Sequence, residues 1–204
     1  MKTTPYHNRL TAEALKKSIY TYLISRDPDG IVGSEVMYGS SRRVADIVFI
    51  SQGRSYAIEI KSEFDTTSRL EGQLEEYQTL FDYIIIFSAP NHIKNITSIL
   101  PTFMGLYCIT DEGIKMIQRE KRNRQVKKSE MLISIPSSTV KSDFAIKGKL
   151  SSDEIRAQVL RKSKKEIHSY FIKYFKGKLE NKASRINTNK IHACSDNTVD
   201  YLII

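Results

Sequence analysis

The 204-residue chain is 40% hydrophobic and 27% charged, which suits a soluble protein of one domain with an appendage, or of two small domains. Its net charge of +9 is unevenly placed. Residues 119–204 hold 20 Lys and Arg against 9 Asp and Glu, whereas residues 1–118 hold 12 against 14. This asymmetry predicts an anionic partner for the C-terminal part, with nucleic acid favoured over a membrane surface. A Lys-rich region that only aids solubility is the alternative.

The sequence argues against two classes of protein. No apolar run approaches the ~18–20 residues of a membrane-spanning helix, and the first 25 residues lack the apolar centre of a signal peptide. Cys108 and Cys194 do not form a disulfide framework, and neither they nor the four histidines follow a zinc-ligand spacing. We therefore expect a cytoplasmic protein that has no membrane partner and no zinc centre.

Helical and extended patterns alternate along the N-terminal part of the chain. The elements expected there are a helix at about 11–25 with Thr11 as N-cap, strands at about 31–38, 43–51 and 54–62, a helix at about 66–81, a buried strand at about 83–89, a short helix near 91–99, a strand near 105–110 and an edge strand at 113–118. This order predicts an α/β fold in which helices flank a mixed sheet.

Beyond residue 118 the pattern changes. A charge run at 119–130 leads into an irregular stretch at 129–150, and about 151–182 is expected to be one long basic helix with an interrupted apolar stripe. We therefore predict a core domain at 1–118 and a basic, mainly helical extension at 119–204. The apolar stripe indicates that the long helix docks on something, which leaves a homodimer or a protein partner possible.

The hairpin between the second and third strands places ionisable residues in apolar sequence. If Gln52 and Gly53 form its turn, Asp46 lies opposite Glu59, and Lys61 projects from the same face two residues further on. Opposed side chains are about 4.5–5.5 Å apart at Cβ, so two carboxylates here repel each other. A three-residue turn would break this register.

A divalent cation removes the conflict between the two carboxylates. Mg²⁺ takes hard oxygen ligands and keeps part of its water shell, and Lys61 is placed to orient a water or to stabilise charge on a phosphate. Metal, water and a fixed cation together favour phosphodiester hydrolysis. The structural alternative is a salt-bridged cluster of Asp46, Glu59 and Lys61 on a solvated sheet face.

Neighbouring elements supply further candidate residues. Glu35 adds a third acid if its strand pairs beside that of Asp46, and is otherwise an exposed strand residue. Arg42 and Arg43 are candidate phosphate ligands or ordinary surface arginines.

The second helix carries a polar stripe. Arg69, Gln73 and Tyr77 recur at intervals of four, which puts them on one side of the helix. Arg69 and Gln73 are candidates to contact a phosphate or to order the site, and Tyr77 taken alone is expected in the core.

These residues resemble the PD-(D/E)XK nuclease superfamily, whose signature is an acid on one strand of a hairpin and Glu-x-Lys on the next, inside an αβββαβ core. Asp46 matches the first acid and Glu59-Ile60-Lys61 the second motif, and Ala45 stands in place of the proline. The segment QLEEY that follows looks like the Q-x-x-x-Y element of the RecB-like exonuclease branch. The resemblance covers about residues 11–110 and is particularly like a small, poorly characterised bacterial branch.

The resemblance implies a restriction-endonuclease-like core and a Mg²⁺-dependent deoxyribonuclease in DNA repair, defence or mobile-element processing, with Mn²⁺ able to substitute. DNA is the expected substrate, with RNA left open. A non-catalytic nucleic-acid-binding or accessory protein that retains the fold is the alternative. No set of four cysteines is present, so an iron–sulfur cluster is not expected.

The resemblance also assigns roles to single residues. Asp46, Glu59 and the carbonyl of Ile60 would hold the metal, and Lys61 would position the attacking water. Glu35 would support metal or water, with Glu13 a competitor for that role. The expected substrate-binding residues are Arg43, Arg69, Gln73 and Tyr77.

Overall fold

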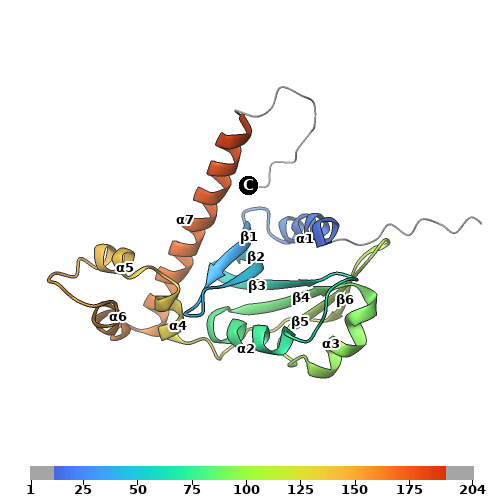
Figure 1. The fold of residues 1–204 in the computed structure, drawn as a ribbon, viewed down its shortest axis with the longest axis horizontal. Coiled ribbons are helices and arrows are strands. Elements are labelled where there is room, and N and C mark those ends of the chain that lie inside the picture. Colours follow the sequence, from blue (N-terminus) through green and yellow to red (C-terminus); the bar gives the residue numbers. More distant parts are fainter. Residues whose placement is uncertain (1–11, 192–204) are drawn as a thin grey trace, which may run out of the picture.

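A six-stranded mixed sheet forms the centre of the protein. The computed structural model describes the backbone of residues 12–191 and the side chains of residues 15–181. The strands are β1 Ile31–Tyr38, β2 Arg43–Ser51, β3 Arg54–Lys61, β4 Tyr83–Ser88, β5 Gly105–Thr110 and β6 Gly113–Gln118. They lie side by side in chain order, with helices packed against the sheet (Figure 1). The expected α/β class and the mixed sheet are confirmed.

The hairpin between β2 and β3 has the register that the sequence predicts. Gln52 and Gly53 both have positive φ, 48° and 68°, as a type I′ turn requires. Ser51 therefore pairs with Arg54, and the ladder continues to Ile47 opposite Ile58. β1 to β3 are antiparallel, β3 to β5 are parallel, and β6 returns antiparallel as an edge strand.

The N-terminal half contributes three α-helices and one 3-10 turn to the two faces of the sheet. They are α1 Ala12–Arg26, α2 Leu70–Leu80, η1 Pro90–His92 and α3 Ile93–Ile99. α1 covers one face with Leu15, Ile19 and Leu23, whereas Leu70 and Ile96 place α2 and α3 in the cluster on the other face. Thr11 and the side chain of Glu13 lie outside the described residues.

α2 begins later than the expected residue 66. The carboxylate of Asp65 accepts a hydrogen bond from the N–H of Ser62 at 2.7 Å, and the N–H of Leu70 donates to the carbonyl of Thr67. These bonds fold the preceding segment into turns, so helical geometry starts only at Leu70.

The single long helix predicted at about 151–182 is wrong, because the chain forms two helices there. α6 Ser152–Leu160 ends before α7 Lys164–Ile191 begins. The N–H of Ser163 donates to the carboxylate of Glu166 at 3.0 Å, and the N–H of Glu166 donates back to the hydroxyl of Ser163 at 3.2 Å. This capping box starts a new helix.

The stretch expected to be irregular, 129–150, contains two further helices. They are α4 Lys128–Ile133 and α5 Ser137–Asp143. At six and seven residues, each is too short to display a full apolar period.

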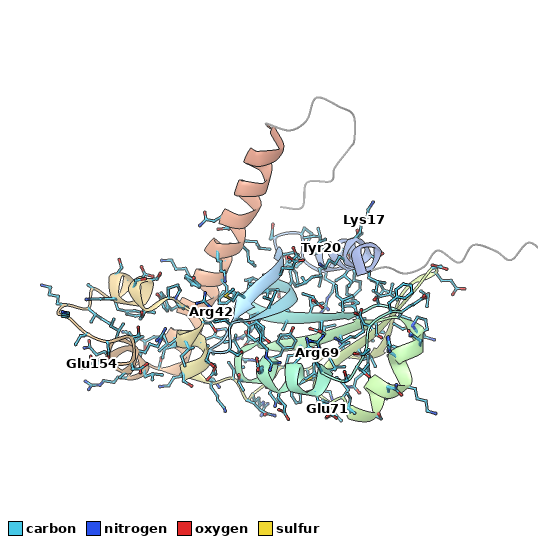
Figure 2. All side chains as sticks on the ribbon, in the orientation of Figure 1. Lys17, Tyr20, Arg42, Arg69, Glu71 and Glu154 are labelled. Atoms are coloured by element: carbon cyan, nitrogen blue, oxygen red, sulfur yellow. The ribbon has the colours of Figure 1, made fainter. Side chains whose placement is uncertain are left out.

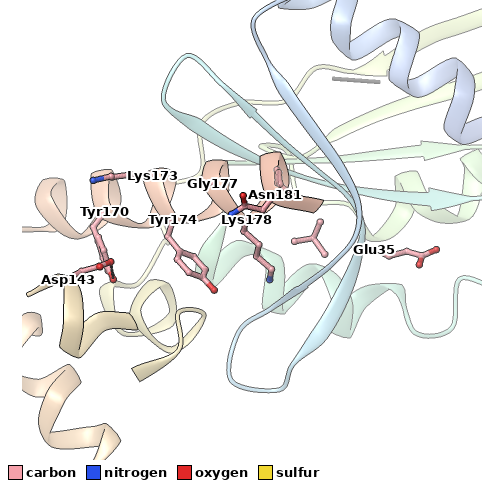
Figure 3. A pocket seen from close by; sticks show the side chains of 10 residues that line it. Glu35, Asp143, Tyr170, Lys173, Tyr174, Gly177, Lys178 and Asn181 are labelled. Carbon is pink, nitrogen blue, oxygen red and sulfur yellow. Dashed lines mark hydrogen bonds between the residues drawn. The ribbon is translucent and has the colours of Figure 1, made fainter. Parts of the chain in front are cut away.

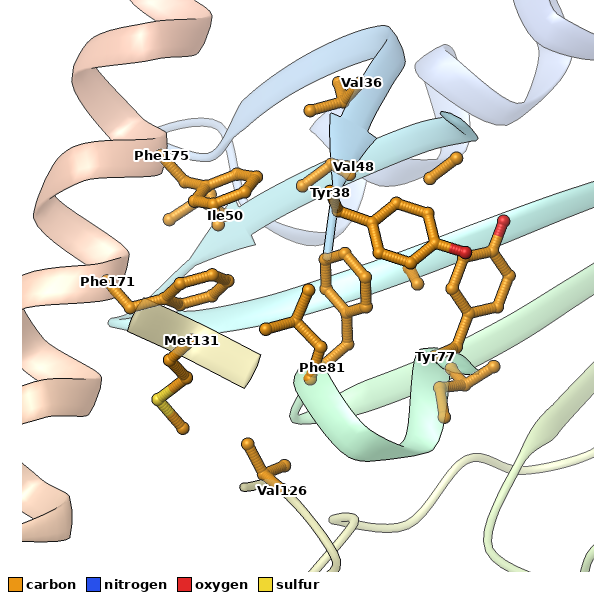
Figure 4. Packing of buried hydrophobic residues seen from close by; sticks show 14 of the residues in the cluster. Val36, Tyr38, Val48, Ile50, Tyr77, Phe81, Val126, Met131, Phe171 and Phe175 are labelled. Atoms are coloured by element: carbon orange, nitrogen blue, oxygen red, sulfur yellow. The ribbon is translucent and has the colours of Figure 1, made fainter. Parts of the chain in front are cut away.

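The C-terminal helices share the core of the sheet. Phe171 and Phe175 of α7 and Met131 of α4 belong to the same buried cluster as Val48 and Ile50 of β2 (Figure 4). α7 also approaches β1 closely, since a Cβ on Gly33 would lie 2.4 Å from a methyl carbon of Leu179. Apolar packing thus crosses residue 118, where the domain boundary stays a prediction. No helix within residues 12–191 is long and apolar enough to cross a membrane.

Candidate active site

The candidate site lies where β2 and β3 separate. Their ladder ends at the pair Ile47–Ile58, and beyond it the N–H of Ile60 donates to Oδ2 of Asp46 at 2.8 Å. One further step of the same register sets Asp46 opposite Glu59. The carboxylate of Asp46, and not a main-chain carbonyl of β2, therefore accepts the hydrogen bond from this N–H of β3.

Glu59 is buried and accepts hydrogen bonds at both oxygens. Nζ of Lys61 donates to Oε1 at 2.8 Å, and the hydroxyl of Tyr77 donates to Oε2 at 2.7 Å. Glu59 and Lys61 are only 2% and 8% exposed, so their ion pair lies in a poorly hydrated setting. Lys61 also donates to Oε1 of Gln73 at 3.3 Å, which brings α2 into the cluster.

Asp46 is in a less favourable electrostatic setting than Glu59. Burial and, next, the negative charge of Glu59 raise the pKa of Asp46 to about 6. The hydrogen bond from Ile60 and the charges of Lys61 and Lys16 oppose this rise. No described residue donates a hydrogen bond to Oδ1 of Asp46, so that oxygen is available to another partner.

Glu35 lies close to the site but faces solvent. It falls between the pairs Ser34–Ile47 and Val36–Ala45, so the register of β1 sets it beside Asp46. Its positive φ of 51° interrupts the extended backbone, and its side chain is 68% exposed. Lys16 of α1 forms an ion pair with it at 3.3 Å. In this geometry Glu35 interacts with Lys16 rather than with Glu59 or Lys61.

The predicted substrate-binding residues divide into two groups. Gln73 and Tyr77 contact Lys61 and Glu59 directly, and Tyr77 is fully buried as well. Arg43 instead pairs with Glu76 at 2.9 Å. Arg69 is exposed at the N-terminus of α2, and its side chain has no hydrogen bond or ion pair to a described residue (Figure 2).

Two residues of the site were not identified from the sequence. The ring of Tyr38 packs against that of Tyr77 with 5.3 Å between centroids, and Lys16 contributes positive charge beside Asp46. Both reach the site through tertiary packing, from β1 and α1. Neither residue belongs to a recognisable sequence motif. The only signal in the sequence is strand alternation, which puts the side chain of Tyr38 on the same strand face as that of Val36.

Asp46 and Glu59 offer oxygen ligands of the kind that a magnesium ion takes. Burial and the neighbouring charge of Glu59 raise the pKa of Asp46. A cation bound to both carboxylates would lower that pKa again. The described part of the chain holds no group of three or more His, Cys, Asp or Glu side chains suited to a metal. Asp46, Glu59 and the Ile60 carbonyl would therefore leave the other positions to water. Metal binding at Glu59 would compete with its hydrogen bonds from Lys61 and Tyr77.

The fold and the site define an α/β protein with a buried carboxylate–lysine cluster at the end of a hairpin. The family model described as Bacteriophage P4 protein cII matches residues 7–201, so the chain belongs to this family. Protein cII of Enterobacteria phage P4 is 31% identical over 78 residues, or 38% of this chain. That match spans 29% of the phage protein's length.

A solved structure also resembles this chain. It is a protein of unknown function from Silicibacter pomeroyi, with a TM-score of 0.43 and 14% identity. The similarity covers 74% of this chain and all of the other.

Proposed function

We propose that the protein is a metal-dependent nuclease that hydrolyses phosphodiester bonds, with DNA as the expected substrate. The observation that carries the proposal is the cluster of Asp46, Glu59 and Lys61, in which two acids lie opposite each other and a buried lysine contacts one of them. The raised pKa of Asp46 supports a cation at this position. The resemblance of these residues to the PD-(D/E)XK signature supports the reaction class.

In this proposal each side chain of the cluster has its own role in hydrolysis. A bound Mg²⁺ would supply Lewis-acid stabilisation of the phosphate and a more acidic water. Asp46 would offer Oδ1, which no described residue occupies. Lys61, 2.8 Å from Glu59, would orient the attacking water or balance charge on the phosphate. Gln73 and Tyr77 act as positioning residues, because they hold Lys61 and Glu59.

Cleavage assays on purified protein test this proposal. Single- and double-stranded DNA and RNA are incubated with Mg²⁺ or Mn²⁺, and we expect cleavage that EDTA abolishes. Asp46→Ala and Lys61→Ala should each lower the rate by about 100-fold or more. The matched controls are Glu71→Ala and Lys94→Ala, which remove one acid and one lysine from exposed helix positions. Cleavage that persists in both site variants would overturn the assignment.

A non-catalytic nucleic-acid-binding protein is the second candidate function. Glu59 has a partner at each oxygen without a metal, and the positive charge of the chain lies in residues 119–204. Binding that weakens steeply with salt, without cleavage in either metal, would favour this candidate.

A further inference from the structure

We propose that a pocket between the β1–β2 turn and the C-terminal helices binds a phosphate group of an organic ligand. The pocket has a volume of about 540 Å³. Its described lining includes three cationic side chains, Arg42, Arg156 and Lys178, and no Asp or Glu. The inference goes beyond the proposed nuclease activity and does not depend on it, because none of these three residues belongs to the carboxylate cluster.

Two of the three cations have only weak or distant acceptors among the described residues. Nε of Arg42 donates to the thioether sulfur of Met37 at 3.4 Å. Arg156 reaches the main-chain carbonyls of Leu132 and Ile135 at 3.4 and 3.5 Å, and the fully exposed Asp153 is 4.0 Å away. Neither guanidinium therefore has a close carboxylate, although a paired carboxylate or phosphate is what its planar fork binds best.

The third cation is held so that it faces the same pocket. Nζ of Lys178 donates to the carbonyl of Met37 at 3.0 Å, which fixes the lysine beside the β1–β2 turn. Tyr174 lies one turn earlier on α7 and lines the pocket as well. Figure 3, which draws a neighbouring pocket that shares Tyr174 and Lys178, shows the two side chains projecting from the same side of the helix. A hydroxyl donor and an aromatic ring thus accompany the positive charges.

Neutral donors complete the lining. Ser137 and Ser138 of α5 contribute hydroxyl groups, and Ser40 contributes the backbone of the turn, whereas the N–H of Gly39 already donates to the hydroxyl of Ser134. Arginine forks with hydroxyl donors are the groups that bind a phosphate's oxygens, and the aromatic ring of Tyr174 suits an attached base. The shared chemistry is therefore a phosphate of a nucleotide, either free or within a strand.

The pocket connects to the candidate active site through two tyrosines. Tyr38 lines the pocket and packs on Tyr77, and the hydroxyl of Tyr77 donates to Glu59. A phosphate bound beside Arg42 and Arg156 would therefore lie on the face of the sheet that carries Glu59.

The absence of tryptophan from the sequence gives a direct test. Tyr174→Trp introduces a single tryptophan into the pocket, which is excited apart from the tyrosines, and Met116→Trp on exposed β6 is the reporter control. Each protein is titrated in EDTA with pyrophosphate, with a nucleoside triphosphate and with a short single-stranded oligonucleotide. We expect a saturable change for Tyr174→Trp with at least one of these ligands and none for Met116→Trp. Calorimetry on the unsubstituted chain checks that the reporter itself has not created the binding.

Charge-removing variants assign the binding to the pocket. Arg42→Gln and Arg156→Gln should each weaken binding by about tenfold or more, as expected for losing a hydrogen bond to a charged group. Lys176→Gln is the matched control, because it removes one charge from an exposed position of α7 outside the pocket. Arg42 is exposed, so its variant tests the pocket even if Arg156→Gln fails to fold.

The ligands distinguish the two sources of the phosphate. Saturation by the triphosphate indicates a free nucleotide, and saturation by the oligonucleotide alone indicates a strand. Equal weakening by Lys176→Gln and Arg42→Gln would overturn the proposal, because it would mean attraction to the basic surface in general. A lack of saturable binding to all three ligands would overturn it as well. Neither result bears on metal-dependent cleavage, which is measured separately.

Discussion

At the scale of single residues, the candidate site balances two acids against one buried lysine. Glu59 receives hydrogen bonds from Lys61 and Tyr77, whereas Asp46 receives one from the N–H of Ile60. Burial and the charge of Glu59 therefore disfavour the ionised form of Asp46 in the folded protein.

Asp46→Asn should stabilise the metal-free protein at neutral pH. Because the pKa of Asp46 rises from its ordinary value of 3.8 to about 6, ionising this group in the folded state costs free energy. The cost is absent below about pH 4, grows as pH rises towards 6 and stays constant above, at about 3 kcal/mol at most. Urea unfolding in EDTA measures this cost as the difference in unfolding free energy between Asp46→Asn and the parent protein.

If the charge of Asp46 is the cause, the difference in unfolding free energy between Asp46→Asn and the parent depends on pH, whereas an effect of the substitution on packing does not. Glu71→Gln, an exposed change on α2, should leave stability within about 0.5 kcal/mol of the parent. An Asp46→Asn protein that is less stable than the parent above pH 6 would contradict the electrostatic account.

Tyr77→Phe should lower the free energy of unfolding by about 1–3 kcal/mol, because it leaves a buried carboxylate oxygen of Glu59 without its donor. Tyr83→Phe is the control, since the Tyr83 hydroxyl makes no hydrogen bond to a described residue. Denaturant unfolding compares the two proteins. Similar losses in both would argue against a specific role for the Tyr77–Glu59 bond.

At the scale of elements, the break before α7 is set by a local signal. Ser163 and Glu166 exchange hydrogen bonds at the start of α7, as Ser151 and Glu154 do at the start of α6. Two capped helices can turn relative to each other where one continuous helix could not. This arrangement lets α7 run across β1 and β2 (Figure 1).

Ser163→Ala should destabilise the protein by about 1 kcal/mol through the loss of the N-cap of α7. Ser169→Ala, at an exposed position within the same helix, should have almost no effect or a slightly stabilising one. Thermal unfolding of both variants checks the difference. An equal response would show that the cap does not hold the start of α7.

The strands were predictable and the C-terminal helices were not, for physical reasons. Alternating apolar residues framed β1 to β3, and a two-residue turn fixed the register even though Gln52 must adopt positive φ. In the basic region the apolar spacing continues from Val159 to Ile167, so periodicity concealed the Ser163–Glu166 cap. The cap signature was nevertheless present in the sequence.

The candidate site was predictable to a similar degree. Strand alternation and the turn placed Asp46, Glu59 and Lys61 together, and helical spacing put Gln73 and Tyr77 on one side of α2. Only the resemblance to the Q-x-x-x-Y element assigned Tyr77 to the site. Lys16 and Tyr38 come from elements whose packing no local pattern specifies. The ion pair of Arg43 with Glu76 likewise depends on where α2 packs against the sheet, which no local pattern specifies.

At the scale of the whole molecule, Asp82 joins α7 to the sheet. Its carboxylate accepts a hydrogen bond from the N–H of Ser55 at 3.0 Å and contacts Nε2 of His168 at 2.7 Å. Burial by itself raises the pKa of Asp82, but the hydrogen bonds with His168 and Ser55 outweigh it and lower the pKa below its ordinary value.

Asp82→Asn should destabilise the protein at neutral pH and weaken its response to acid. A lowered pKa in the folded state means that ionised Asp82 contributes stability above the unfolded pKa of 3.8. That contribution is lost as pH falls through the lower, folded-state pKa. Unfolding free energies from pH 7 down to about pH 2 measure this loss, with exposed Asp111→Asn as the control. An acid response unchanged by Asp82→Asn would contradict the role assigned to this carboxylate.

The packing of Phe171 and Phe175 against Val48 and Ile50 affects how mutants of this protein are interpreted. α7 exposes lysines outwards and buries these two rings beneath them. A substitution on the buried side of the helix would loosen the strand that carries Asp46 and would disturb the candidate site without changing any of its side chains. In a genetic screen such a mutant would be mistaken for one defective in ligand contact. Thermal unfolding of each variant separates the two kinds of defect.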